Sequence, residues 1–281
     1  MHLTKPIQTP MATTGHLCAS DGAEFENPTL YRSTIGSLQY LSFMRPDLAY
    51  AVNCVCQYMH APCVPHWQAV KRILRYLRHT VHFGLFFARS FASILATYSD
   101  ADWAGCLDDR RSTGGLCIYL GSHLISWSSC KQPTIARSST EAKYKAVANA
   151  TCELPWIQSL FRDLGVPLTA PPVLWCDNLG ATYLSANPVM HSCTKHVHVD
   201  FHFVRNWVAS GSLVVSFVSN KDQLADVLTK PLSGARFTAL CTSLSVLSLP
   251  LSLRGDVEAQ SAAPMESTSA ASSMCSNTSS S

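Results

Sequence analysis

The stretch between residues 92 and 240 alternates between strand-like and helical spacing, and this alternation restricts the fold more than any other feature. The strand-like runs are Ile94–Ser99, Gly115–Leu120, His123–Ser128, Val173–Cys176 and Leu213–Val218. A tight turn at Gly121 joins the second run to the third, so the first three predict an antiparallel meander. The last two alternate with helical segments, which favours parallel pairing. Together they predict an α/β fold with a mixed sheet, three antiparallel strands and then two parallel strands, flanked by helices.

Four helices are predicted in the same stretch. The first is capped by Ser138 and Ser139 and ends near Leu164, before Gly165 and Pro167. The second begins near Asn178, the third covers 194–208, and the fourth begins at Asp222.

The residues before this stretch have helical spacing. In the range 28–91 apolar residues recur three and four positions apart, which predicts a small helical N-terminal region. One of its helices carries only basic charges, at Lys71, Arg72, Arg75 and Arg78. With no acid between them, these side chains predict a surface that follows a phosphate backbone, and the alternative is an ordinary solvated polar face.

Composition indicates the character of the two ends of the chain, and it argues against a disulfide-bonded, secreted or membrane-spanning protein. Residues 1–27 lack periodicity and predict a flexible lead-in, while the Ser- and Ala-rich residues 241–281 predict a disordered tail. The twelve cysteines include no Cys-x-x-Cys pair, so we expect reduced thiols. The start lacks the apolar core of a signal peptide, and no run reaches the roughly 18 residues of a membrane span. We therefore expect a soluble, intracellular protein with no membrane partner.

Four carboxylates stand where predicted strands end or predicted helices begin. Asp100 and Asp177 each follow an apolar strand, Glu141 lies in the first turn of a helix, and Asp226 lies early in another. Such positions can converge at one edge of a sheet. Each close pair of acids would then cost several kcal/mol at an effective dielectric near 20, so a cation is required. Oxygen ligands favour Mg²⁺ or Mn²⁺, and a pair of ions predicts phosphodiester chemistry.

Several motifs surround these acids. They are Tyr98–Gly105, Arg111–Thr113, Ile125–Ser129, Ser138–Ala142, Cys176–Asn178, Thr194–Val197 and Gln223–Leu232. They closely resemble the ribonuclease H region of copia-type LTR retrotransposon Pol polyproteins. Upstream, Tyr31–Ser33, Leu38–Leu41, Arg45–Asp47 and Ala69–Leu77 resemble the connecting end of the reverse transcriptase in the same polyprotein.

The resemblance implies an RNase H-like fold and endonucleolytic hydrolysis of RNA in RNA–DNA hybrids, with two Mg²⁺ ions or with Mn²⁺. By motif position it implies that Asp100, Glu141, Asp177 and Asp226 are the catalytic and metal-binding acids, with Asp200 as the alternative to Asp226. We also expect Asn178 to contact nucleic acid. The expected partners are an RNA–DNA hybrid and a separate reverse transcriptase polymerase region.

The chain departs from the family at three positions. The family usually has an acid where Lys143 stands, an acid where His198 stands and a basic residue where Cys193 stands. Because Lys143 is two residues from Glu141, we expect it to point away from the site on a helix. The alternative left open is a catalytically idle remnant that folds and binds nucleic acid without cutting it.

Overall fold

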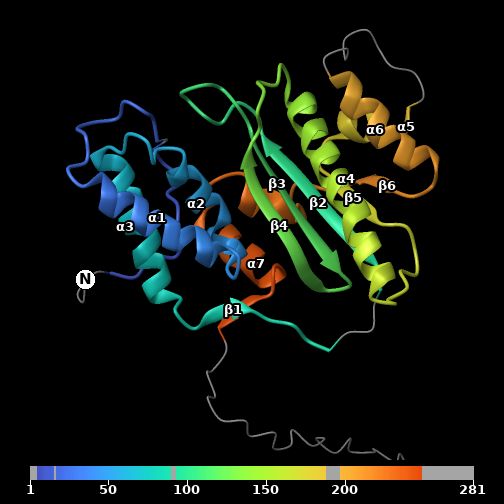
Figure 1. Cartoon of the computed structure of the whole chain (residues 1–281), viewed down its shortest axis with the longest axis horizontal. Coiled ribbons are helices and arrows are strands. Elements are labelled where there is room, and N and C mark those ends of the chain that lie inside the picture. Colours follow the sequence, from blue (N-terminus) through green and yellow to red (C-terminus); the bar gives the residue numbers. More distant parts are fainter. Residues whose placement is uncertain (1–4, 16, 90–92, 188–196, 249–281) are drawn as a thin grey trace, which may run out of the picture. The chain divides into compact units, whose positions relative to one another are not determined.

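The computed structural model describes residues 5–15, 17–89, 93–187 and 197–248, which belong to one compact unit (Figure 1). The helices are α1 (Pro28–Ser42), η1 (Pro46–Leu48), α2 (Ala49–Cys56), α3 (Val64–His79), α4 (Ser139–Asp163), α5 (Leu179–Ala186), α6 (His198–Ala209), η3 (Leu224–Leu228) and α7 (Gly234–Ser243). The strands are β1 (Phe83–Leu85), β2 (Leu95–Asp102), β3 (Thr113–Leu120), β4 (His123–Lys131), β5 (Val173–Cys176), β6 (Val214–Phe217) and β7 (Val246–Ser248).

Five strands form the central sheet in the order β4-β3-β2-β5-β6. β4, β3 and β2 are antiparallel neighbours, whereas β2, β5 and β6 run parallel. The predicted mixed sheet is therefore confirmed. The register pairs Ser99 of β2 with Cys176 of β5, so the residues that follow, Asp100 and Asp177, meet at one edge of the sheet.

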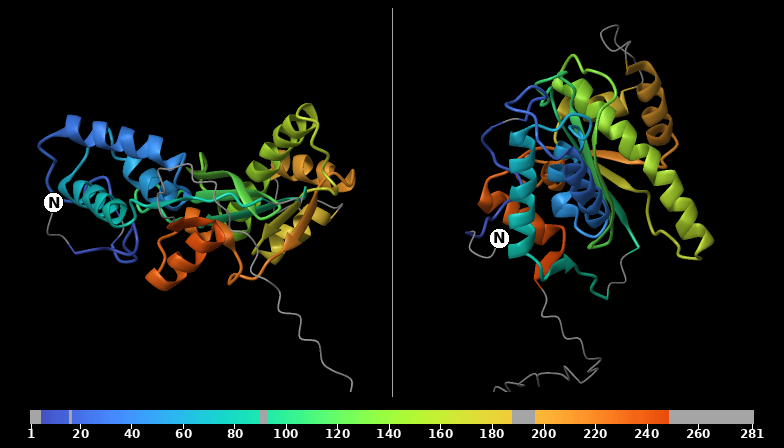
Figure 2. Two further views of the ribbon diagram at one scale, coloured as in Figure 1. Left: turned by 90° about the horizontal axis from the view of Figure 1, so that it is seen from below. Right: turned by 60° about the vertical axis from the view of Figure 1, so that its left-hand side comes forward.

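Alternating side chains of β3 fill two separate cores. Leu116 and Ile118 pack in one cluster with α4, α5 and α6. Cys117 and Tyr119 pack in the other with α1, α2, α3, η3 and α7. This alternation follows from the period of two in a strand, and Figure 2 shows α4 and α7 on opposite faces of the sheet.

A buried polar network holds helices of the N-terminal region together. Arg45 donates to both carboxylate oxygens of Asp47, at 2.9 and 2.8 Å, and its Nη1 donates to the carbonyl of Thr80 at 2.9 Å. Tyr76 of α3 donates to Asp47 at 2.7 Å. Since Arg45 and Asp47 are both almost fully buried, these contacts hold η1 against α3.

Two predicted segments differ from the structure. The last predicted helix, from Asp222, is a 3₁₀ turn (η3) followed by α7. Residues 241–248 were expected in a disordered tail, but they complete α7 and form β7, which pairs antiparallel with β1. This pairing joins positions far apart in sequence, so no local sequence pattern predicts it. The remaining tail, 249–281, and the start of the helix expected from 194 lie outside the described residues.

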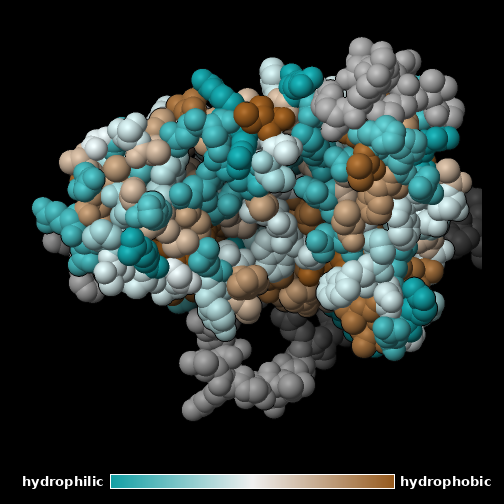
Figure 3. Space-filling model, turned by 45° about the horizontal axis from the view of Figure 1, so that its top comes forward, coloured by the Kyte–Doolittle hydropathy of each residue, from teal (hydrophilic) through white to brown (hydrophobic). Residues whose placement is uncertain are grey.

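Exposed hydrophobic side chains are scattered among polar ones on the face in Figure 3 rather than gathered in one area. In the described ranges no helix is both long and apolar enough to cross a membrane. Every cysteine that the structure describes is a free thiol. The division into a helical region over 28–91 and a ribonuclease H-like domain over 92–240 stays a prediction.

Candidate active site

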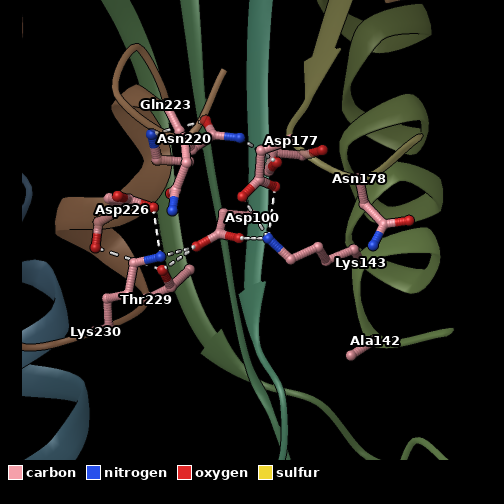
Figure 4. A network of polar contacts seen from close by, with 12 residues as sticks. Asp100, Ala142, Lys143, Asp177, Asn178, Asn220, Gln223, Asp226, Thr229 and Lys230 are labelled. Carbon is pink, nitrogen blue, oxygen red and sulfur yellow. Dashed lines mark hydrogen bonds and ion pairs between the residues drawn. The ribbon is translucent and has the colours of Figure 1, made fainter. Parts of the chain in front are cut away.

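Three of the four predicted acids gather at the edge of the sheet where β2 and β5 end. Asp100 is the sixth residue of β2, Asp177 directly follows β5, and Asp226 lies in η3, which packs against β2 and β3. Asp100 has only 1% of its surface exposed, and Asp226 has 4%. Figure 4 shows the three carboxylates turned toward the same space.

Lys143 of α4 enters this space between two of the aspartates (Figure 4). Its Nζ lies 2.8 Å from Oδ1 of Asp100 and 2.6 and 2.5 Å from the two oxygens of Asp177. The expectation that Lys143 points away was wrong. Lys143 lies on the same helix face as Val147, Ala150 and Leu154, which pack on the sheet.

Two further cations complete the cluster on the side of η3. Lys230 Nζ is 2.7 Å from Asp226 Oδ1 and 3.5 Å from Asp100 Oδ2. Arg236 of α7 lies 3.7 Å from Asp226 Oδ2. Thr229 donates to Asp100 Oδ2 at 2.5 Å. Three carboxylates thus face three cations, and the cluster is close to neutral.

The pKa shifts follow from these pairs. Burial opposes ionisation of Asp100, but Lys143 and Lys230 outweigh it and lower the pKa of this carboxyl below its usual value. Burial would lower the pKa of Lys143, yet Asp100 and Asp177 raise it. Burial raises the pKa of Asp226, against the effect of Lys230. Asp100 and Lys143 are therefore a charged pair at neutral pH.

Glu141, the fourth predicted acid, has its contacts elsewhere. Its Oε2 accepts the backbone N–H of Arg137 at 2.7 Å, and its Oε1 pairs with Lys145 at 2.7 Å. Its own N–H donates to Ser138 at 3.2 Å. These contacts cap the start of α4. The predicted convergence of all four acids is therefore not what the structure has, because Glu141 and Lys143 lie on different faces of one helix.

Asp200, the alternative fourth acid, lies in α6. Its electrostatic neighbours are Lys145 and Glu141, while burial raises its pKa. Asp226, by contrast, has Asp100 and Asp177 as electrostatic neighbours. The geometry thus places Asp226, rather than Asp200, with the other two aspartates.

The residues present do not fit a pair of divalent ions. Such ions need several unpaired carboxylate oxygens converging at about 2.0–2.1 Å from Mg²⁺. Here ammonium groups stand between the aspartates, and no group of three or more His, Cys, Asp or Glu side chains in the described part of the chain is arranged to hold a metal ion. The role of these residues in binding metal stays a prediction.

The predicted nucleic-acid contacts divide into exposed and covered positions. Lys71 and Arg78 are exposed on α3. Arg72 donates to the hydroxyl of Thr9 at 2.9 Å and Arg75 to the carbonyl of Lys5 at 3.1 Å, so the N-terminal segment lies over them. Asn178 accepts the N–H of Ala181 at 2.8 Å and caps α5.

Sequence reasoning missed Lys143, Lys230, Thr229 and Arg236 as members of the cluster. A signal for Lys143 was present, since it stands four, seven and eleven residues before Val147, Ala150 and Leu154. That spacing extends the buried stripe of α4 by one turn toward the end of β2. No comparable signal existed for Arg236, whose position depends on the path of the chain after η3.

No protein-family model matches the chain. The N-terminal RNase H domain of rv2228c from Mycobacterium tuberculosis, solved as a fusion protein, aligns with 54% of this chain and 99% of that chain. Its sequence identity is 10% and its TM-score is 0.37. A family assignment therefore comes from sequence relatives.

Two curated relatives from Arabidopsis thaliana match most of the chain. The retrovirus-related Pol polyprotein from transposon RE2 is 54% identical over 255 residues, which is 91% of this chain and 18% of the relative. The corresponding polyprotein from transposon RE1 is 53% identical over 250 residues, covering 89% of this chain and 17% of the relative. The chain thus spans less than a fifth of the length of these relatives. It belongs to the retrovirus-related Pol polyproteins of copia-type transposons.

Proposed function

We propose that this chain is an RNase H-like domain that binds RNA–DNA hybrids and does not hydrolyse them. One observation carries the proposal: Lys143 Nζ contacts Asp100 and Asp177 at 2.5–2.8 Å, where hydrolysis would require a divalent cation. A lysine ammonium neutralises the two carboxylates but cannot act as a Lewis acid on a phosphodiester.

The hybrid as ligand is supported by the motifs shared with the ribonuclease H region of the family, over Tyr98–Gly105 and Gln223–Leu232. Lys71 and Arg78 supply exposed positive charge on α3 for the backbone. Recognition would depend on groove shape and the 2′-hydroxyl, not on base sequence.

The second candidate is the metal-dependent ribonuclease itself. It is favoured by the meeting of Asp100, Asp177 and Asp226 at one sheet edge. In that case divalent ions would displace Lys143 from the two aspartates, and the hybrid would be cut.

Binding of a fluorescent RNA–DNA hybrid, measured by anisotropy with EDTA and with Mg²⁺, tests the proposal. We expect binding in both conditions, with Kd values within about twofold of each other, and weaker binding of double-stranded DNA. The double variant Lys71→Gln/Arg78→Gln should weaken binding and reduce its salt dependence, whereas Lys221→Gln, at an exposed turn, serves as the matched control. A protein that binds no hybrid, or that yields shortened RNA, contradicts the proposal.

A further inference from the structure

Lys143 balances the negative charge of Asp100 and Asp177, and this balance bears on whether the cluster can bind a metal ion. Its side chain is 14% exposed, and its partners Asp100 and Asp177 are 1% and 5% exposed. Charges this deeply buried persist only with partners. As long as Lys143 is present, the cluster has as many cations as carboxylates and has no electrostatic need for an added ion.

We infer that Lys143 is a built-in counter-ion that excludes divalent metal, and that position 143 alone decides whether this edge of the sheet binds a metal ion. The inference rests on the proposed function, because it names the residue that keeps the domain from holding a catalytic ion. It concerns binding of the metal alone, in the absence of nucleic acid.

The charge balance supports one ion after a single substitution. Lys143→Glu would leave four carboxylates facing the two remaining cations, Lys230 and Arg236. Two net negative charges in a buried site are unfavourable, and one divalent ion neutralises them. Carboxylate ligands at this density select Mg²⁺ or Mn²⁺ over softer metals.

The geometry supports the same conclusion. A glutamate carboxylate oxygen stands at about the position of the lysine Cε, one single bond of about 1.45 Å short of Nζ. An ion held by that oxygen at about 2.0–2.1 Å would therefore lie close to the present Nζ position. The oxygens of Asp100 and Asp177 already surround this position at 2.5–2.8 Å, so small shifts would bring them to ligand distance.

Mn²⁺ binding to the full chain tests the inference. Wild type, Lys143→Glu, Lys143→Gln and the exposed control Lys221→Glu are titrated with Mn²⁺, and free Mn²⁺ is measured by electron paramagnetic resonance. We expect Lys143→Glu to bind one Mn²⁺ at least about tenfold more tightly than wild type. Lys143→Gln, which replaces the ammonium with a neutral amide and adds no negative charge, should lie between them, and Lys221→Glu should equal wild type.

Thermal unfolding supplies a second readout, because an ion that binds only the folded state raises its unfolding temperature. Mn²⁺ should raise that temperature in Lys143→Glu and leave it unchanged in wild type. If Lys143→Glu is unfolded until Mn²⁺ is added, the inference is supported. Wild type binding Mn²⁺ as tightly as Lys143→Glu overturns it, as does a folded Lys143→Glu or Lys143→Gln that binds no more than wild type. Cleavage of a hybrid by wild type would instead contradict the proposed function, which is a separate result.

Discussion

Gly115 of β3 lies directly opposite Asp100 of β2, and its missing side chain leaves the space that Thr229 occupies. A Cβ at position 115 would stand 2.7 Å from Thr229 Cγ2 and 2.8 Å from Leu228 Cβ. Thr229 uses this space to donate to Asp100 at 2.5 Å. The glycine therefore sets how closely η3, which carries Asp226, approaches the sheet.

Gly115→Ala should push η3 away from β3 and lower the free energy of unfolding by about 1–3 kcal/mol, as overpacking does. Urea denaturation measures this change. The neighbouring Gly114→Ala is the control, because its Cβ would meet no atom closer than 3.6 Å. Equal effects of the two substitutions would show that the contact with η3 is not the cause.

Lys143→Met should destabilise the fold by about 3–5 kcal/mol in EDTA, because it leaves Asp100 and Asp177 without their common partner in a buried site. Lys131→Met removes a partner of Asp109, which is 37% exposed, and should cost about 1 kcal/mol or less. Chemical denaturation at neutral pH compares them. A loss at position 143 as small as that at position 131 would mean that the buried pair contributes little.

The pH dependence of stability should reveal the ionisation of Asp102. Burial raises the pKa of this carboxyl to about 7, and Asp100 adds to the shift. Because this pKa is above the unfolded value of about 3.9, the folded state is favoured when Asp102 is protonated, and stability falls as pH rises from about 4 to 7. Asp102→Asn should therefore stabilise the protein by about 1–3 kcal/mol at pH 8 and by little at pH 4.

Unfolding of wild type and Asp102→Asn by urea at the two pH values checks this prediction. The amide keeps an oxygen that can accept the N–H of Thr113, as Asp102 does. A stabilisation of equal size at both pH values would mean that ionisation of Asp102 is not responsible.

Arg45→Lys should cost roughly 1.5–3 kcal/mol, because a lysine cannot make the paired contacts to Asp47 and also reach Thr80. Arg32→Lys changes an exposed arginine that donates to the carbonyls of Met59 and His60, and should cost about 0.5 kcal/mol or less. Thermal unfolding of both variants measures the difference. Similar costs would show that burial does not strengthen the Arg45 network.

Local patterns predicted the parts of the fold that depend on short-range chemistry. The period-two runs predicted the five strands, and the end positions of Asp100 and Asp177 predicted their meeting, because parallel strands share an edge. Contacts between distant segments were not predictable in this way. The cover over Arg72 and Arg75 comes from residues about 65 positions earlier, and β7 pairs with a strand more than 150 residues before it.

The sequence predicted that the aspartates meet. It predicted the wrong face of α4 as the one that reaches them. The position of Glu141 at the start of a helix predicts a site residue, but the first turn of a helix also favours an acid for its charge alone. The buried stripe through Val147, rather than residue type, determines which side chain faces the sheet. That stripe ends at Lys143.

Cleavage of an RNA–DNA hybrid under single-turnover conditions, with protein in excess, shows whether the domain hydrolyses the hybrid that it binds. The labelled RNA strand is followed in Mg²⁺ and in Mn²⁺, for wild type and for Asp100→Asn. We expect wild type to bind the hybrid and to leave the RNA intact in both metals, as Asp100→Asn does. Shortened RNA from wild type that is absent with Asp100→Asn would contradict the proposed lack of hydrolysis.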